Sequence, residues 1–185
     1  MNDHSGHMHL MAMHLADEDA TAALAQALAR TQPGAAMVHL QGDLGAGKST
    51  LARAWLRALG VTGPVRSPTY TLVERYPLAS GGEALHLDLY RIGDAGELEF
   101  LGLDDIEPAL WLVEWPERAE RGGLPPADLR VALAVDGAGR SAQLQAVSAL
   151  GHRWLAALAS SAGWRGPCAV PCWTFLIGRF GRGGI

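Results

Sequence analysis

A phosphate-binding pattern constrains this chain more than any other feature of its sequence. The pattern G-x-x-x-x-G-K-[ST] is matched at every fixed position by residues 42–49, GDLGAGKS. Glycines allow consecutive backbone N–H groups to point toward one anion, because side chains at these positions would block that approach. The helix that follows such a loop adds the positive end of its dipole. The motif therefore predicts a loop between a strand and a helix that binds the phosphates of a nucleotide.

The segments on either side of the motif supply the context that it requires. Residues 37–41, MVHLQ, are a short apolar run that predicts a strand. Residues 49–59 predict a helix, because Leu51, Trp55 and Leu59 recur at every fourth position and share one face. A strand before the loop and a helix after it favour a genuine phosphate loop over a chance glycine-rich turn.

The motif lysine, Lys48, is the only lysine in the chain. The sequence has 15 lysine and arginine residues in all, so every other basic side chain is arginine. With such a bias, arginine is expected at every position where either cation is acceptable. We therefore infer that position 48 requires lysine. A flexible ammonium reaches the β- and γ-phosphates as a point charge, whereas a planar guanidinium cannot take that geometry.

The remaining sequence alternates predicted helices and strands. Apolar residues at helical spacing predict a helix over residues 17–30, with Asp17 as its cap. Alternating or continuous apolar runs predict strands over residues 70–76, 84–90, 109–113, 129–135 and 142–147. The first two of these strands could form a hairpin around a turn at 79–82, and the last two a closing pair. Further helices are predicted over residues 97–102 and 150–158.

Two acids are candidates for the metal and water chemistry that a phosphate loop requires. Glu114 follows the continuous apolar run 109–113. Such a run is typical of a buried central strand and predicts that Glu114 lies at the end of this strand. With the Ser49 hydroxyl, it is a candidate ligand of Mg²⁺. The alternative is a surface carboxylate at a strand end.

Asp88 is the second acid, and it lies in a strand of alternating character. The alternation places His86, Asp88 and Tyr90 on one face, a row suited to polarising water or holding a magnesium-bound water. A salt bridge of Asp88 with Arg91 or Arg75 remains the alternative, and for His86 a structural role is favoured over catalysis.

Thr69, in the segment Ser67-Pro68-Thr69, is a further candidate. In many nucleotide switches the loop after the first helix carries a threonine that senses the γ-phosphate or its magnesium ion. A simple proline turn leading into a strand is the alternative for this segment.

Length and composition indicate one domain with extensions at both ends. Among the 185 residues, 15–159 are expected to form this domain, with an unstructured His- and Met-rich start at 1–14 and a poorly ordered tail at 160–185. Histidines in the start match no defined metal-site spacing, and Cys168 and Cys172 in the tail are too few for a zinc site.

The charge and hydropathy of the chain exclude several classes of protein. Its net charge of −4 argues against broad non-specific binding to nucleic acid. No apolar stretch approaches the roughly 18 residues of a membrane span, and the start lacks the pattern of a signal peptide. We therefore expect a cytoplasmic protein that has no membrane partner.

Several blocks of the sequence together resemble the bacterial TsaE (YjeE) family over residues 15–158. In order along the chain they are GDLGAGKST, SPTYTLVERY, HLDLYR, ELEFLGL and LVEWPE. The phosphate loop alone is shared by a vast superfamily, whereas the other blocks in this order are specific. The resemblance implies an α/β P-loop NTPase fold, with a mixed sheet of parallel core and antiparallel hairpin flanked by helices.

The same resemblance implies roles for individual residues. The nucleotide phosphates would be held by Gly42, Asp43, Leu44, Gly45, Ala46, Gly47, Lys48, Ser49 and Thr50. Glu114 would be the second magnesium ligand beside Ser49, and Asp88 would be needed for hydrolysis. Thr21 resembles a position near the nucleotide, and Arg140 one near the base or ribose. Trp115 resembles an exposed tryptophan near the nucleotide that contacts partner proteins.

By resemblance, the activity would be that of a small Mg²⁺-dependent ATPase needed for threonylcarbamoyl modification of adenosine 37 in tRNA. Proteins of this family act with TsaD and TsaB, which carry the transfer chemistry, so tRNA would be met only through the complex. Isolated hydrolysis should be slow, because a partner completes the positioning that phosphoryl transfer needs. Nine acids and one arginine lie between residues 94 and 120. This acidic segment is either a solvated face or a docking surface for a basic partner.

Two other functions fit a phosphate loop. A small-molecule kinase fits the size and the His86–Asp88 face, but it requires an acceptor site and an arginine-rich lid, and segment 94–120 is acidic. A nucleotide-gated binding module without turnover would keep its function when Asp88 is replaced. A GTPase is disfavoured because the guanine motif [NT]-K-x-D needs a second lysine.

Overall fold

The computed structural model describes residues 10–93, 97–98, 101–103, 106–119 and 124–161. Its strands are β1 (Leu10–Leu15), β2 (Ala36–Gln41), β3 (Val73–Pro77), β4 (Glu83–Asp88), β5 (Leu110–Glu114), β6 (Leu129–Asp136) and β7 (Gly139–Ala146). Its helices are α1 (Glu18–Thr31), α2 (Lys48–Ala58), α3 (Ala149–Ser160) and the short 3-10 helix η2 (Pro116–Ala119).

All seven described strands form one mixed sheet in the order β1-β7-β6-β2-β5-β4-β3. The central strands β6, β2, β5 and β4 are parallel, while β3 pairs with β4 and β7 with both β6 and β1 in antiparallel fashion. The predicted hairpin and closing pair are thus confirmed, as is the P-loop NTPase fold. Because parallel strands end at one edge, the ends of β2, β4 and β5 lie together, where α/β sheets bind ligands.

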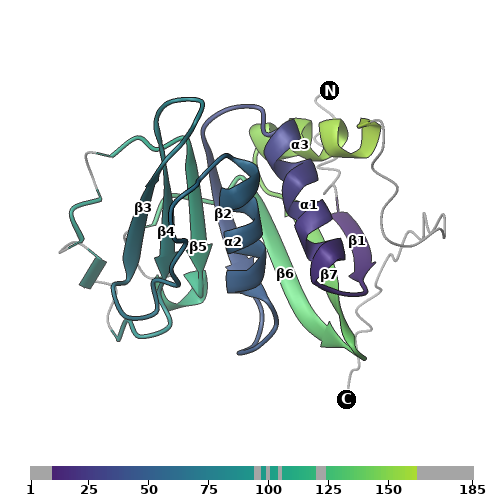
Figure 1. Cartoon of the computed structure of the whole chain (residues 1–185), viewed down its shortest axis with the longest axis horizontal. Helices are drawn as coiled ribbons and strands as arrows, with labels where there is room; N and C mark the ends of the chain where they lie inside the picture. The colour runs from purple at the N-terminus through teal and green to yellow at the C-terminus, as the bar shows by residue number, and fades with distance from the viewer. Residues whose placement is uncertain (1–9, 94–96, 99–100, 104–105, 120–123, 162–185) are drawn as a thin grey trace, which may run out of the picture.

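The helices α1 and α2 lie side by side against one face of the sheet, and α3 packs against α1 and β7 (Figure 1). Trp55 of α2 and Trp154 of α3 meet edge to face, with ring centroids 5.6 Å apart. Trp154 Nε1 also donates to the Leu28 carbonyl of α1 at 3.1 Å. These contacts join the three helices into one layer, which holds the start of α2 at the ligand edge of the sheet.

The N-terminal segment differs from the prediction of an unstructured start over residues 1–14. Leu10–Leu15 form β1, which pairs with β7 from Leu10 opposite Gln145 to Leu15 opposite Arg140. Met11, Met13 and Leu15 alternate along the strand and pack on the core, with Leu15 only 1% exposed. An edge strand of six residues gains its stability from β7, which the local sequence does not reveal. Residues 1–9 of the predicted start and 162–185 of the predicted tail lie outside the described residues.

The strand predicted from residue 70 begins only at Val73. Residues 68–71 form a turn, and Leu72 has a positive φ of 64° and donates its N–H to the Pro68 carbonyl. This turn brings the preceding segment back toward β4. Elsewhere the predicted helix at 97–102 has 3-10 geometry at Glu97, Leu98 and Leu101, whereas Gly102 lies outside it with a positive φ of 61°. Among the described helices, none is long and apolar enough to cross a membrane.

Candidate nucleotide site

The phosphate loop runs from the end of β2 to the start of α2, as its sequence predicts. Gly42, Gly45 and Gly47 all have positive φ angles, of 136°, 80° and 103°. These values are strained for residues with a Cβ atom, and a Cβ on Gly42 would also collide with the Leu133 carbonyl of β6. Backbone conformation therefore favours glycine at all three positions, and close packing against β6 requires it at Gly42 as well.

Lys48 lies within the curve of this loop and is only 4% exposed. Its Nζ donates to the carbonyls of Gly42 at 2.6 Å and Asp43 at 2.9 Å. Burial lowers the pKa of the ammonium, and nearby carboxylates, that of Glu114 foremost, offset part of this effect. The ammonium is thus held where a bound phosphate chain would meet the loop N–H groups.

Ser49 and Glu114 come together beside the lysine. The Ser49 hydroxyl donates to Glu114 Oε2 at 2.8 Å, and Glu114 is 2% exposed at the end of β5. Among the described residues no group of three or more His, Cys, Asp and Glu side chains could enclose a metal. One hydroxyl and one carboxylate nevertheless fit Mg²⁺, which keeps several waters and takes its remaining ligands from nucleotide phosphates.

Asp88 and Thr69 form a second polar pair at the same edge. The Thr69 hydroxyl donates to Asp88 Oδ2 at 2.8 Å, while Asp88 Oδ1 accepts the Tyr90 backbone N–H at 3.0 Å. The alternative salt bridges of Asp88 are not formed, since Arg75 pairs with Glu83 at 2.6 Å and Arg91 lies over the Tyr70 ring. The turn at residues 68–71 thus places Thr69 at the end of β4.

These residues line a cavity of about 300 Å³ over the phosphate loop. Its walls include Lys48, Ser49, Thr69, Asp88 and Glu114, which the fold draws from four separate segments. A hydroxyl, an ammonium and two carboxylates that converge on one space can hold a phosphate chain, a metal ion and a water.

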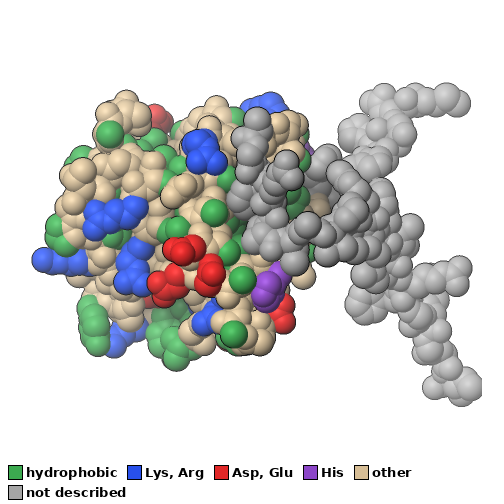
Figure 2. All heavy atoms as spheres, turned by 45° about the vertical axis from the view of Figure 1, so that its right-hand side comes forward, with side chains coloured by type: hydrophobic (Ala, Val, Ile, Leu, Met, Phe, Trp, Pro, Cys, Tyr) green, Lys and Arg blue, Asp and Glu red, His purple; other side chains and the backbone are tan. Residues whose placement is uncertain are grey.

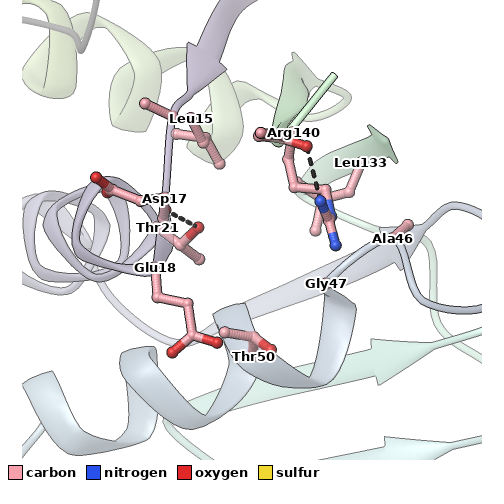
Figure 3. A pocket seen from close by; sticks show the side chains of 12 residues that line it. Leu15, Asp17, Glu18, Thr21, Ala46, Gly47, Thr50, Leu133 and Arg140 are labelled. Carbon is pink, nitrogen blue, oxygen red and sulfur yellow. Dashed lines mark hydrogen bonds between the residues drawn. The ribbon is translucent and has the colours of Figure 1, made fainter. Parts of the chain in front are cut away.

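A second cavity of about 330 Å³ adjoins the first (Figure 3). Gly47, Thr50 and Arg140 line both spaces, so a single elongated ligand can occupy the two. Thr21 and Glu18 of α1 lie on one side, and Arg140 enters from the opposite side. The Arg140 guanidinium donates to the Gly45 carbonyl at 3.2 Å and thereby ties β7 to the phosphate loop.

Trp115 differs from the exposed tryptophan that the resemblance implies. The residue has a positive φ of 58° and is half-buried. Its ring lies 3.8 Å below Lys48 Nζ and 5.0 Å from the Tyr90 ring, measured to centroids. The left-handed backbone turns the indole inward toward the phosphate loop, so one part of it remains accessible while another contacts Lys48.

The model of a protein family, the threonylcarbamoyl adenosine biosynthesis protein TsaE, matches residues 15–143 of this chain. The chain belongs to the TsaE family. The matched residues run from the end of β1 through most of β7, so they include every residue of the two cavities. The resemblance of the sequence blocks to this family is therefore confirmed.

Individual TsaE relatives agree with this assignment. The tRNA threonylcarbamoyladenosine biosynthesis protein TsaE of Haemophilus influenzae is 44% identical over 128 residues, covering 68% of this chain and 80% of that protein. The protein of the same name from Streptomyces coelicolor is 36% identical over 138 residues, covering 72% and 93%. The crystal structure of YdiB from Bacillus subtilis superposes with a TM-score of 0.67 at 27% identity, covering 84% of this chain and 97% of that one.

Two residues of the site were not assigned to it from the sequence. Glu18 falls within the helix predicted over residues 17–30 and was given no role there, but it lines the second cavity. His86, for which a structural role was favoured, contacts Glu114 with its Nε2 atom 2.8 Å from Oε1. The alternation in the sequence already placed His86 on the same face as Asp88, close to the predicted site. In contrast, only the fold reveals the position of Glu18.

Proposed function

We propose that this chain is the Mg²⁺-dependent ATPase subunit that the cell requires for threonylcarbamoyl modification of adenosine 37 in tRNA, acting in the cytoplasm with TsaD and TsaB. Membership of the TsaE family supports the pathway. The observation that carries the ATPase activity is the convergence of Lys48, the Ser49–Glu114 pair and the Thr69–Asp88 pair on one cavity.

The shape of the two adjoining cavities supports the proposed nucleotide binding. The triphosphate would lie over residues 42–50, with Lys48 on the β- and γ-phosphates and the N–H groups of the loop around them. Adenosine would occupy the second cavity, between Thr21 on α1 and Arg140 on β7. Ser49 and Glu114 would hold Mg²⁺, which would supply positive charge to neutralise the phosphates.

Hydrolysis would depend on Asp88 and Thr69. In the proposed reaction the Asp88 carboxylate orients a water molecule, whose oxygen bonds to the γ-phosphorus as the bond to the ADP oxygen breaks. The Thr69 hydroxyl is engaged with Asp88 at 2.8 Å, so it must rotate or shift to reach a γ-phosphate. Such a change would report the state of the nucleotide to the surface segment around Tyr70.

Contact with partner proteins would occur around the mouth of the phosphate cavity. Leu44, Tyr70 and Tyr90 are 76%, 82% and 41% exposed, although all three are large apolar side chains. Arg91 and Arg118 lie over the rings of Tyr70 and Tyr90. Tyrosine, tryptophan and arginine dominate the binding energy of protein interfaces. A partner on this rim, with Trp115 beside it, would cover the cavity and speed a reaction that is slow in isolation.

The surface charge supports indirect rather than direct contact with tRNA. The whole chain has a net charge of −4. On the face drawn in Figure 2, acidic side chains gather at one place among scattered basic ones, so the described part of this face carries no broad positive surface. Phosphate backbones are bound through such positive surfaces, so tRNA would be met through TsaD and TsaB.

ATP hydrolysis by the purified protein, alone and with TsaD and TsaB, tests the proposal. We expect slow turnover alone and stimulation by the two partners together. Turnover that the partners leave unchanged, or transfer of phosphate to a small metabolite, would favour the alternative of a small-molecule kinase.

A further inference from the structure

A histidine beneath the proposed magnesium site has no assigned role. His86 lies on β4, two residues before Asp88, and its side chain is completely buried. Its neighbours Leu85 and Leu87 face the opposite side of the sheet and pack in a separate apolar cluster. His86 Nε2 lies 2.8 Å from Glu114 Oε1 on the adjacent parallel strand.

The hydrogen bonds of Glu114 determine what His86 does. An ionised carboxylate only accepts hydrogen bonds, so Nε2 carries the proton and donates to Oε1. The other oxygen, Oε2, accepts the Ser49 hydroxyl at 2.8 Å. The carboxylate is therefore held from one side by His86 and turned with its other oxygen toward the phosphate loop.

A purely structural role explains His86 poorly. Its Nδ1 atom is buried and has no hydrogen-bond partner among the residues that the structure describes. An unsatisfied buried polar atom opposes folding, and a leucine of similar size would avoid that loss in an apolar strand. Asp88 cannot take over the contact with Glu114, because it serves as an acceptor, from the Thr69 hydroxyl and the Tyr90 N–H, and a carboxylate has no hydrogen to donate.

We propose that His86 is a positioning residue that orients the Glu114 carboxylate, so that Oε2 and the Ser49 hydroxyl form a preassembled magnesium site. The inference rests on the proposed magnesium-dependent binding of ATP. Groups that hydrogen-bond to a metal ligand orient it, and their loss typically weakens metal affinity roughly ten- to hundredfold. His86 contacts neither nucleotide cavity and acts only through Glu114.

Three substitutions separate orientation from simple packing. Glutamine at position 86 places an amide N–H near the position of Nε2, so His86→Gln keeps the donor to Glu114. Asparagine is one methylene shorter, so His86→Asn keeps a polar side chain but does not reach Oε1. His86→Leu removes the donor and the unsatisfied Nδ1 together while it retains most of the volume.

The measurement is the affinity of each variant for a fluorescent, non-hydrolysable ATP analogue, mant-AMPPNP, in excess Mg²⁺ and in EDTA. The affinity in Mg²⁺ divided by the affinity in EDTA measures how much the metal contributes to nucleotide binding. The affinity in EDTA alone shows whether the phosphate loop is intact. We expect His86→Leu and His86→Asn to lower this ratio about tenfold with the EDTA affinity unchanged, and His86→Gln to retain most of it.

A wild-type ratio in His86→Leu or His86→Asn would overturn the inference. If His86→Leu does not fold, the asparagine and glutamine variants decide the question, and equal ratios in these two would overturn it equally. A ratio near one in the wild-type protein would instead refute the magnesium dependence of the proposed function, which is a distinguishable failure.

Discussion

Replacement of Asp88 by asparagine tests the proposed hydrolysis most directly. Asparagine has the shape of aspartate, and its carbonyl oxygen can accept the Tyr90 N–H that now lies 3.0 Å from Oδ1. Its NH₂ group takes the place of Oδ2, which accepts the Thr69 hydroxyl at 2.8 Å. That hydroxyl can rotate to accept a hydrogen bond instead of donating one. Asp88→Asn therefore preserves the local contacts and removes only the negative charge.

The expected effect on rate is large and the effect on folding small. A side chain that orients or activates the attacking water contributes roughly 10²- to 10⁴-fold, which corresponds to about 2.7–5.4 kcal/mol of activation free energy. The free energy of unfolding should change by less than about 1 kcal/mol, because each hydrogen bond is kept or exchanged. Loss of a carboxylate near the γ-phosphate removes a repulsion, so ATP affinity should be retained or rise.

The assay is single-turnover release of phosphate from ATP in the presence of TsaD and TsaB, with nucleotide binding and thermal unfolding measured on the same samples. Glu83→Gln is a matched control, because it makes the same chemical change on the same hairpin at a carboxylate that pairs with Arg75. A rate for Asp88→Asn within about threefold of wild type, less than 1 kcal/mol of barrier, would refute the assignment of Asp88 to hydrolysis.

Three further predictions concern Lys48, Trp154 and His39. Lys48→Ala should weaken ATP binding roughly ten- to hundredfold, the worth of a charged hydrogen bond, and wild-type affinity by fluorescence titration would contradict the phosphate-loop assignment. Trp154→Ala should lower the free energy of unfolding, measured by urea denaturation, by about 3–5 kcal/mol, because the ring is fully buried against Trp55. A loss below about 1 kcal/mol would argue against the described core. Burial and Arg130 lower the pKa of His39 from 6.5 to about 4, so its contribution to stability is complete above pH 6.5 and is lost as pH falls toward 4. His39→Phe should flatten that part of a melting-temperature profile, and an unchanged slope would exclude His39 as its source.

The phosphate loop could be predicted from the sequence because its function is local. Gly42, Gly47 and Lys48 act within one short segment, and the backbone angles that phosphate binding needs restrict the residue types directly. The apolar run before Glu114 likewise predicted a buried strand with an acid at its end. In the β3–β4 hairpin the alternation was clear, but the strand start was placed too early because the turn after Thr69 depends on a positive φ at Leu72.

Contacts between distant segments were beyond local reasoning. β1 was missed because an edge strand is stabilised by its partner, and only the tertiary structure shows that β1 pairs with β7. The contact of His86 with Glu114 depends on β4 and β5 being parallel neighbours in a particular register. Glu18 lines the second cavity only because α1 packs beside α2.

By itself, the sequence determined the phosphate loop, most of the strands and helices, and through its ordered blocks the TsaE family. Short-range patterns specify these features, since backbone angles and apolar periodicity are properties of a few consecutive residues. The tertiary structure alone decided which side chains meet. Parallel pairing brought Asp88 and Glu114 to one edge of the sheet, the β7 turn brought Arg140 to the phosphate loop, and burial left His86 with Glu114 as its one described hydrogen-bond partner.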